Sequence, residues 1–140
     1  MKAKNLMSSK LVTVDLDDSL ALIKDIFDHV SFHHLLVVEG PKLLGVISDR
    51  DLLKAISPNV ETVAATSKDL ATLNKKAHQI MTRNPVTIND SASIIEAVEL
   101  FNSHSISCIP VVNEQGKPVG IITWRDIMRE IGNRNKGKGE

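Results

Sequence analysis

Aromatic residues are scarce in this 140-residue chain, which has three Phe, one Trp and no Tyr. Single-stranded RNA is read largely by stacking its bases on aromatic side chains, so this composition argues against an RNA-binding platform. Neither sign of charge is in excess, because 17 Lys and Arg balance 17 Asp and Glu. The composition therefore gives no global electrostatic case for nucleic acid or for an anionic membrane as a partner.

Cysteine is also nearly absent. Cys108 is the single one, which excludes an intrachain disulfide and is typical of a reducing, cytoplasmic setting. No apolar run approaches the roughly 18 residues of a membrane-spanning helix, and no apolar segment follows Lys2 and Lys4 as it would in a secretory signal. With 42% hydrophobic and 24% charged residues, we expect a folded globular protein in the cytoplasm.

Motifs for catalysis are missing as well. Gly40 and Gly45 have the glycine spacing of a P-loop, but Val46 and Ile47 stand where the phosphate-binding Lys and the Ser or Thr would be required. The sequence contains no H-E-x-x-H, no G-x-S-x-G and no pair of cysteines. We therefore expect no catalytic residue, no metal site and no enzyme activity.

What the chain does contain is an internal repeat. The stretch "GVISDRDLL" at 45–53 matches "GIITWRDIM" at 120–128, and "VTVDLDDSLALIKDIF" at 12–27 matches "VTINDSASIIEAVELF" at 86–101. The offset is 74 residues before the turn that follows "HHLLVVE" and "SCIPVVN", and 75 residues after it. Because insertions are tolerated in turns, this pattern predicts one fold repeated over 6–54 and 80–131.

Each copy has the pattern of strand, helix, strand, turn, strand, helix. The β-branched "VTV" and "VTI" predict short strands, and Ser19 and Ser93 precede segments with helical periodicity. Ser93 and Glu96 have the spacing of a capping box. We expect residues 55–79 to be a linker with one helix at about 69–79. The polar, Gly-rich stretch 132–140 is expected to be a disordered tail.

Taken in order, these motifs resemble a known family. The segments "IMTRNPVTI", "SCIPVV" and "GIITWRDI" in the second copy, with "LMSSKLVTV", "HHLLVV" and "GVISDRDLL" in the first, are similar to the cystathionine-β-synthase (CBS) domain. The resemblance covers nearly all of residues 6–131. The chain thus resembles a stand-alone pair of CBS domains, called a Bateman module.

The resemblance implies an α/β (α+β) fold of two pseudo-symmetric β-α-β-β-α repeats packed through their sheets. In this family the two clefts between the repeats often bind adenosine compounds, namely AMP, ADP, ATP, S-adenosylmethionine, NAD or cyclic di-AMP. Such modules commonly form flat homodimers, and they sense ligands rather than catalyse. The implied ligand is thus a regulatory adenine nucleotide, with no cofactor required.

Thr123 and Asp126 have two compatible interpretations. A hydroxyl residue followed three positions later by a carboxylate is the pattern of a capping box, which stabilises a helix by roughly 0.5–2 kcal/mol. The carboxylate is also a suitable acceptor for the two vicinal ribose hydroxyls, and the adjacent helix N-terminus can receive a phosphate. Ser48 and Asp51 repeat the pattern in the first copy, and in the family these positions hold ribose and phosphate.

Further positions follow from the resemblance. Thr13 and Thr87 would lie at the cleft edge and contact the base or a phosphate, although each is equally well an ordinary strand residue. An apolar slot for the purine would be formed by Val86, Ile109, Pro110 and Ile122, which plain core packing would explain as well. Candidate phosphate contacts are Arg50, Arg125, His33 and His34, and the alternative for the two arginines is a surface salt bridge.

The sequence departs from the family at His33 and His34, where the family often carries Arg-His. A neutral His is a poorer phosphate partner than Arg, and its pKa near about 6.5 would make any such contact pH-dependent. Strand alternation sends neighbouring side chains to opposite faces, so a metal site built from this pair is not expected.

Three hypotheses about function follow. The leading one is a homodimeric regulatory module that senses an adenine nucleotide and signals by conformational change to an unknown effector protein. The second is a structural dimerisation scaffold whose clefts stay empty. The third is a nucleic-acid-binding CBS protein, which the neutral charge and the scarcity of aromatics disfavour.

Overall fold

The computed structural model describes residues 1–137. The chain folds into two compact units. The first-repeat unit is Val12–Asn84, and the second-repeat unit combines Met1–Leu11 with the chain from Pro85 onward. Each unit has its own sheet and helices, so the expected α/β class is confirmed.

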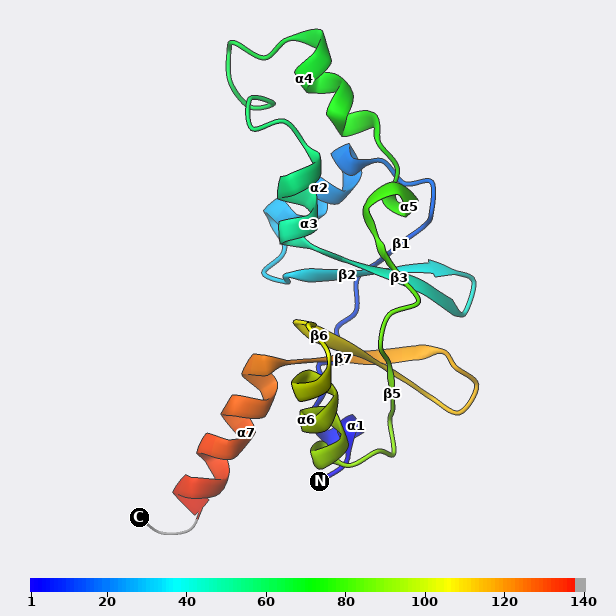
Figure 1. Cartoon of the computed structure of the whole chain (residues 1–140), viewed down its shortest axis with the longest axis vertical. Helices are drawn as coiled ribbons and strands as arrows, with labels where there is room; N and C mark the ends of the chain where they lie inside the picture. Colours follow the sequence, from blue (N-terminus) through cyan, green and yellow to red (C-terminus); the bar gives the residue numbers. More distant parts are fainter. Residues whose placement is uncertain (138–140) are drawn as a thin grey trace. The chain divides into compact units, whose positions relative to one another are not determined.

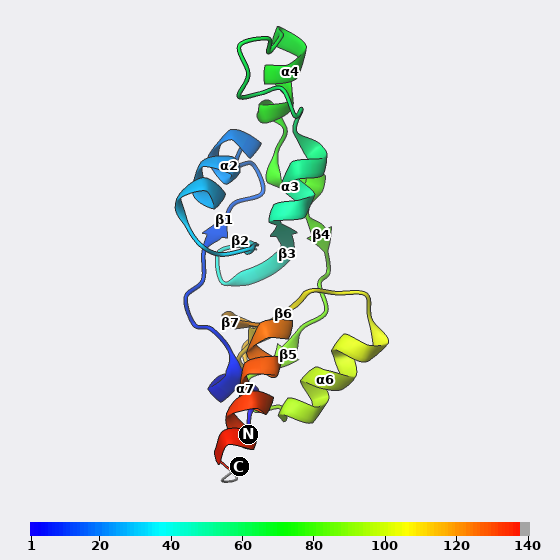
Figure 2. The same ribbon diagram turned by 90° about the vertical axis from the view of Figure 1, so that its left-hand side faces the viewer.

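The first-repeat unit follows the predicted order of elements. Its sheet has the strand order β1-β2-β3-β4, with β1 parallel to β2 and the other neighbours antiparallel. Helices α2 and α3 lie side by side on one face of that sheet (Figures 1 and 2). The elements are β1 (Thr13–Val14), α2 (Leu20–His29), β2 (His34–Glu39), β3 (Lys42–Ser48), α3 (Asp49–Ala55), α4 (Ser67–Ala71), the 3-10 helix η1 (Thr72–Asn74), α5 (Ala77–Ile80) and β4 (Thr82–Arg83).

The second-repeat unit repeats the arrangement. Its sheet has the order β5-β6-β7, again with a parallel pair followed by an antiparallel hairpin. The elements are α1 (Ala3–Leu6), β5 (Ile88–Asn89), α6 (Ile94–Ser103), β6 (Cys108–Val112), β7 (Pro118–Thr123) and α7 (Trp124–Gly137). The predicted sequence of strand, helix, strand, strand, helix is thus confirmed in both copies.

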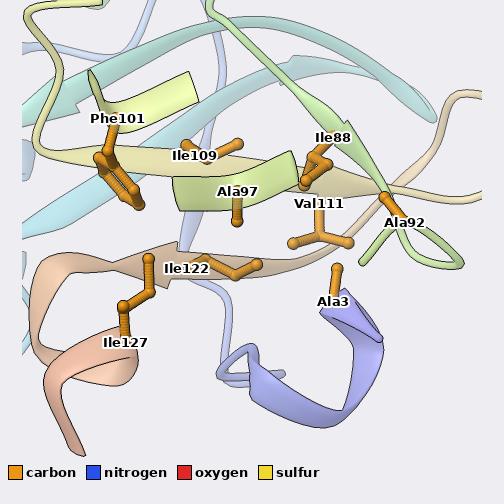
Figure 3. Packing of buried hydrophobic residues seen from close by; sticks show 9 residues of the cluster. All are labelled: Ala3, Ile88, Ala92, Ala97, Phe101, Ile109, Val111, Ile122 and Ile127. Atoms are coloured by element: carbon orange, nitrogen blue, oxygen red, sulfur yellow. The ribbon is translucent and has the colours of Figure 1, made fainter. Parts of the chain in front are cut away.

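One face of each sheet packs against helices to form a hydrophobic core. In the second-repeat unit the cluster takes Ile109 and Val111 from β6 and Ile122 from β7, and helices α6 and α7 contribute Phe101 and Ile127 (Figure 3). Alternation along a strand puts these residues on one face of the sheet, and burying each such side chain fully contributes about 1.5–3 kcal/mol. The first-repeat unit has the corresponding cluster around Leu35, Val37 and Ile47.

Each core also uses residues that lie outside the contiguous repeat. Ala3 of α1 is fully buried in the cluster around β6 and β7 (Figure 3), and Ala77 of α5 is fully buried in the cluster around β2 and β3. The two alanines are 74 positions apart, which is the repeat offset. A segment that precedes the "VT" strand of one repeat therefore completes the unit that contains the other repeat.

The segment that follows each of these alanines pairs antiparallel with a strand at a glycine, with β7 at Gly120 and with β3 at Gly45. Ser8 and Ile121 exchange two backbone hydrogen bonds, of 2.9 and 3.0 Å, and a Cβ built on Gly120 would lie 2.9 Å from the Ser8 carbonyl oxygen and also against Met7. At Gly45 a Cβ would lie 2.6 Å from the Met81 sulfur. The glycine that opens "GVIS" and "GIIT" thus permits a close approach of two backbone segments.

Two segments differ from expectation. Residues 69–79 do not form one helix, because α4 ends at Ala71 and α5 begins only at Ala77. Helix α7 continues to Gly137, where the composition predicted disorder from residue 132 on. Its first turns are fixed by Ile127 in the core, so each later residue adds a hydrogen bond without a new nucleation cost. An ion pair of 3.1 Å between Arg134 and Glu130 supports that extension, and the expectation for Lys138–Glu140 lies outside the described residues.

The predicted helix caps are present in part. Ser19 and Ser93 are the N-caps of α2 and α6, and their hydroxyls accept from Leu22 N–H and Glu96 N–H at 3.2 Å each. The return bond from the Ser93 backbone to the Glu96 side chain, which a full capping box needs, is not formed among the described residues. Serine capping therefore operates without the box at this helix.

We expect Gly120→Ala to destabilise the protein, because the new methyl group meets Ser8 and Met7, and overpacking of this kind typically costs about 1–3 kcal/mol. Urea unfolding followed by circular dichroism measures the effect. Gly132→Ala is the matched control, since Gly132 lies in α7 with nothing within 4 Å of its added Cβ, and helix propensity predicts a gain of up to about 1 kcal/mol. Equal effects of the two changes would contradict the close approach.

Candidate functional site

In the first-repeat unit the predicted hydroxyl–carboxylate pair lies where β3 ends and α3 begins. The Ser48 hydroxyl accepts from Asp51 N–H at 3.1 Å, and Ser48 N–H donates to Asp51 Oδ2 at 2.8 Å. Both bonds of a capping box are therefore present. This geometry fixes the orientation of the Asp51 carboxylate at the first turn of α3.

The equivalent pair in the second-repeat unit uses its atoms differently. Thr123 N–H donates to Asp126 Oδ2 at 2.8 Å, and the Thr123 hydroxyl donates to the same oxygen at 3.2 Å. The other carboxylate oxygen, Oδ1, lies 3.6 Å from the Arg129 guanidinium. Only 14% of the Asp126 side chain is exposed, so this carboxylate is held in place at the start of α7.

This arrangement leaves Asp126 Oδ1 able to accept further hydrogen bonds. A carboxylate has about four acceptor positions, and the two Thr123 donors both use Oδ2. Oδ1 can thus accept further hydroxyl donors, next to a helix N-terminus that favours negative charge. Capping alone would produce similar geometry, because Thr66 and Asp69 form the same box at α4, outside the two repeats.

The other candidate residues of the second-repeat unit differ in their burial, because those before β5 reach the surface and those on β6 and β7 are buried. Thr87 precedes β5 and is exposed, and Val86 beside it is half-buried. Pro110 is buried on β6, opposite Ile121 in the register of the hairpin. Ile109 and Ile122 are instead fully buried within the core cluster (Figure 3), where the alternative interpretation as plain core placed them. Their role in an apolar slot stays a prediction.

The exposed polar candidates Thr13 and Arg50 belong to the first-repeat unit, and Arg125 belongs to the second-repeat unit. Thr13 is the exposed first residue of β1, and Arg50 is exposed in the first turn of α3. Arg125 occupies the matching exposed position in α7. Within residues 1–137 neither arginine forms an ion pair, so both guanidinium groups are available to an anion.

His33 and His34 have different surroundings. His33 is exposed, and its Nδ1 lies 2.8 Å from Asp49 Oδ2. His34 is half-buried on β2, opposite Ser48 on β3. Burial lowers the pKa of His34, with only partial compensation by the charges of Asp49 and Asp51. A neutral imidazole results at pH 7, which makes His34 a weak partner for a phosphate.

Three contacts were not foreseen from the sequence. Asp49 contacts His33, Arg129 lies beside Asp126, and in each unit a methionine packs against a strand glycine, Met7 against Gly120 and Met81 against Gly45. The methionines had a signal, because both stand in the repeated motifs "LMSS" and "IMTR" at the 74-residue offset. For Arg129 the only sequence signal was its position three residues after Asp126, which places both residues on the same helix face.

Within residues 1–137, no three side chains of His, Cys, Asp or Glu converge in a way that would hold a metal ion. The helices of the described part are too short or too polar to cross a membrane.

Comparison with known proteins identifies the family. The model of the CBS domain matches residues 3–58 and again 77–133, so the chain belongs to the CBS domain family. A CBS domain-containing protein of Dictyostelium discoideum is 34% identical over 127 residues, which covers 89% of this chain and 87% of that protein. Each of the two stretches matched by the CBS domain model begins at one of the buried alanines, Ala3 or Ala77.

Solved structures show the same fold. The CBS domain pair of protein MJ0100, in complex with 5-methylthioadenosine and S-adenosyl-L-methionine, matches with a TM-score of 0.78 at 27% identity, covering 96% of this chain and 98% of that one. CBSX2 in complex with AMP matches with a TM-score of 0.77 at 24% identity, covering 96% and 98%. The second likeness shows the fold alone.

Other relatives are much longer than this chain. Inosine-5'-monophosphate dehydrogenase of Methanocaldococcus jannaschii is 29% identical over 129 residues, which is 91% of this chain but 23% of the enzyme. The similarity thus covers about a quarter of that enzyme.

We expect the free energy of unfolding to fall as the pH drops from about 7.5 to 5.5, in part because of His34. Its folded pKa lies below its ordinary value of 6.5, so in that window the unfolded state binds more protons and stability is lost on acidification. In His34→Gln the loss should be smaller, as measured by urea unfolding across this range.

His29 provides the control for that comparison. Its pKa is raised, first by the hydrogen bond to the Asp25 carbonyl and then by the Asp25 charge. Stability from this group is therefore lost as pH rises, so His29→Gln should change the pH slope in the opposite direction to His34→Gln. Equal slopes in wild type and His34→Gln would show that burial of His34 has no energetic consequence.

Proposed function

We propose that this protein is a regulatory module that binds an adenosine-containing nucleotide and has no catalytic role of its own. The observation that carries the proposal is the hydroxyl–carboxylate pair at the same point of both repeats, at the junction of β3 with α3 and of β7 with α7. The adenosyl ligands of the CBS domain pair of protein MJ0100, a relative at 27% identity, support an adenosine compound as the ligand class.

Asp126 has the central role in this proposal. Its Oδ1 would accept the vicinal hydroxyls of the ribose, while Thr123 keeps the carboxylate in orientation through Oδ2. Ionised acceptors make the stronger hydrogen bonds, which suits a ligand that presents two hydroxyl donors. Arg125, exposed and without an ion pair within residues 1–137, would contact a phosphate.

The adenine would be bordered by the apolar candidates of the same unit, with Thr87 at the edge. Val86 and Pro110 are the members of that group whose side chains lie outside the core cluster. Ser48 and Asp51, with Thr13 and Arg50, would form the corresponding half-site of the first-repeat unit. AMP, ADP, ATP, S-adenosylmethionine, NAD and cyclic di-AMP all present the same adenosine chemistry.

Signalling would follow from a shift between two conformations. A ligand changes such an equilibrium only by the difference of its affinities for the two states, so an effector protein that distinguishes these states would respond to nucleotide level. We place this activity in the cytoplasm, which suits a chain whose single cysteine is buried.

The module is also proposed to act as a homodimer. Helix α7 exposes three large apolar side chains, Trp124, Met128 and Ile131, and large exposed apolar patches mark interaction sites. The ring of Trp124 packs on Phe101 with centroids 5.1 Å apart, which fixes its orientation while half of its surface remains exposed.

The test is isothermal titration calorimetry with AMP, S-adenosylmethionine and 5-methylthioadenosine, each compared with its 2′-deoxy analogue. A hydrogen bond to a charged group contributes about 1.5–3 kcal/mol, so removal of the 2′-hydroxyl should weaken binding to wild type by roughly 10- to 100-fold. In Asp126→Asn that difference should largely disappear, because the charged acceptor is gone.

Asp69→Asn is the matched control for this titration. Asp69 is the carboxylate of the capping box at the start of α4, and this helix lies outside both repeats. This substitution should lower thermal stability without changing nucleotide affinity. If no adenosine compound binds wild type, and Asp126→Asn behaves like Asp69→Asn, the pair is only a helix cap and a structural scaffold becomes the better account.

A further inference from the structure

The first-repeat unit contains a pocket whose lining includes none of the residues proposed above to bind a nucleotide. It has a volume of about 370 Å³ and lies between α2, α3 and the segment that follows α3. Both helices cover the same face of the sheet (Figure 2). Pockets that bind small molecules have volumes of about 300–1,000 Å³, so this one is large enough for a small ligand.

Most of the pocket lining is apolar and belongs to the core of the unit. Leu52 and Ile56 are buried members of the cluster around β2 and β3, and Phe27 and Val60 pack against that cluster. Leu53, by contrast, is 70% exposed. The complete apolar lining is Phe27, Leu52, Leu53, Ile56, Pro58 and Val60. The pocket therefore has an apolar floor in the core and opens to solvent beside Leu53.

The wall that follows α3 exists because this helix ends early. Helix α3 ends at Ala55, and a residue that precedes a proline, as Ser57 precedes Pro58, is disfavoured in helical conformation. The corresponding positions of the second repeat, 75 residues later, are Gly132 and Asn133, and α7 continues through both. Among the residues that the structure describes, this wall is thus specific to the first repeat.

Hydrogen bonds and an ion pair hold the wall in place. Ser57 N–H donates to Thr72 Oγ1 at 3.0 Å, and the Ser57 hydroxyl donates to Asp69 Oδ1 at 2.8 Å. Further along the segment, Glu61 forms an ion pair with Lys24 of α2. The pocket is therefore formed before a ligand binds, which lowers the ordering cost of binding.

The polar part of the lining is acidic. It has three carboxylates, Asp28, Asp49 and Glu61, and one ammonium group, that of Lys24. The Lys24 side chain is only 18% exposed and pairs with Asp28, at 2.7 Å, and with Glu61. Asp28 and Glu61 are exposed, and Asp49 is half-buried. One cation does not neutralise three carboxylates, so the pocket presents a net negative charge to solvent.

We propose that this pocket binds a small organic cation with an apolar body, of the class of an alkylamine that carries an aromatic ring. The apolar body would cover Phe27, Leu52 and Ile56, and the ammonium group would face the carboxylates, with which charge-assisted hydrogen bonds are strong. Anionic nucleotides are excluded from this pocket, because their phosphates would meet carboxylates of the same sign. The site is therefore distinct from the proposed nucleotide half-sites and goes beyond the proposed function.

A titration with 4-phenylbutylamine, followed by nuclear magnetic resonance of the backbone amides, tests the site. The amides of Leu53, Ile56 and Val60 should shift, with a dissociation constant on the order of 1 mM for a ligand of this size. The analogue 4-phenylbutyrate keeps the apolar body and reverses the charge, and n-butylamine keeps the charge without the ring. Each should bind at least about fivefold more weakly, because one of the two interactions is lost.

A charge variant tests the acidic rim. Asp28→Asn combined with Glu61→Gln leaves Lys24 and Asp49 as the charged groups of the lining. Its affinity for 4-phenylbutylamine should fall by about 2- to 10-fold, since exposed ion pairs contribute modestly, and 4-phenylbutyrate should no longer be disfavoured. Asp25→Asn is the matched control, because Asp25 is exposed on the same helix but does not line the pocket, and it should bind both compounds as wild type does.

Three results would overturn the proposal. Equal affinity of wild type for 4-phenylbutylamine and 4-phenylbutyrate would exclude a cationic ligand class, and unchanged pocket amides at roughly 10 mM amine would exclude the site. Amide shifts that change with protein concentration alone would show that a second copy covers the pocket. None of these results affects nucleotide binding measured by calorimetry, so failure of this proposal is distinguishable from failure of the proposed function.

Discussion

The structure depends on a close antiparallel pairing of two backbone segments that occurs once in each unit. At Gly120 the segment after α1 passes along β7, and at Gly45 the segment after α5 passes along β3. Ala3 and Ala77 enter the two cores from these segments. Each segment precedes the "VT" strand of the other repeat, so each core is completed by residues outside its own repeat. As a result, the second-repeat unit joins residues 1–11 to the chain from Pro85 onward.

The two strands in these pairings, β3 and β7, also carry the candidate site. Both β3 and β7 end in the hydroxyl residue of the pair, and the carboxylate follows in the first turn of the next helix. Packing of β3 and β7 against the cores therefore determines where Asp51 and Asp126 lie. The two pairs differ in one atom's role, since the Ser48 hydroxyl accepts from the backbone and the Thr123 hydroxyl donates to the carboxylate.

Much of the fold was predictable from the sequence, because the chain contains the same series of motifs twice. The repeat of "VT", "LLVV" or "IPVV", and "GVIS" or "GIIT" predicted five elements in each copy and the family. Periodicity did not predict how the copies exchange α1 and α5, since short helices of four residues have too few positions to show a pattern. It also missed the length of α7, whose polar composition indicated disorder although a packed first turn supports further helix. The net charge of the chain also gave no sign that residues 12–84 carry a formal charge of −2 and residues 1–11 with 85–137 a formal charge of +2.

The most direct test of the central claim is a nuclear magnetic resonance titration of the backbone amides with S-adenosylmethionine. If the repeated pair binds the ligand, the largest shift changes at low ligand ratios occur at Thr123 to Asp126, with a second group at Ser48 to Asp51 when the pair of the first-repeat unit also binds. Shift changes confined to other parts of the chain, or none at millimolar ligand, would contradict the claim that the repeated hydroxyl–carboxylate pair binds a nucleotide.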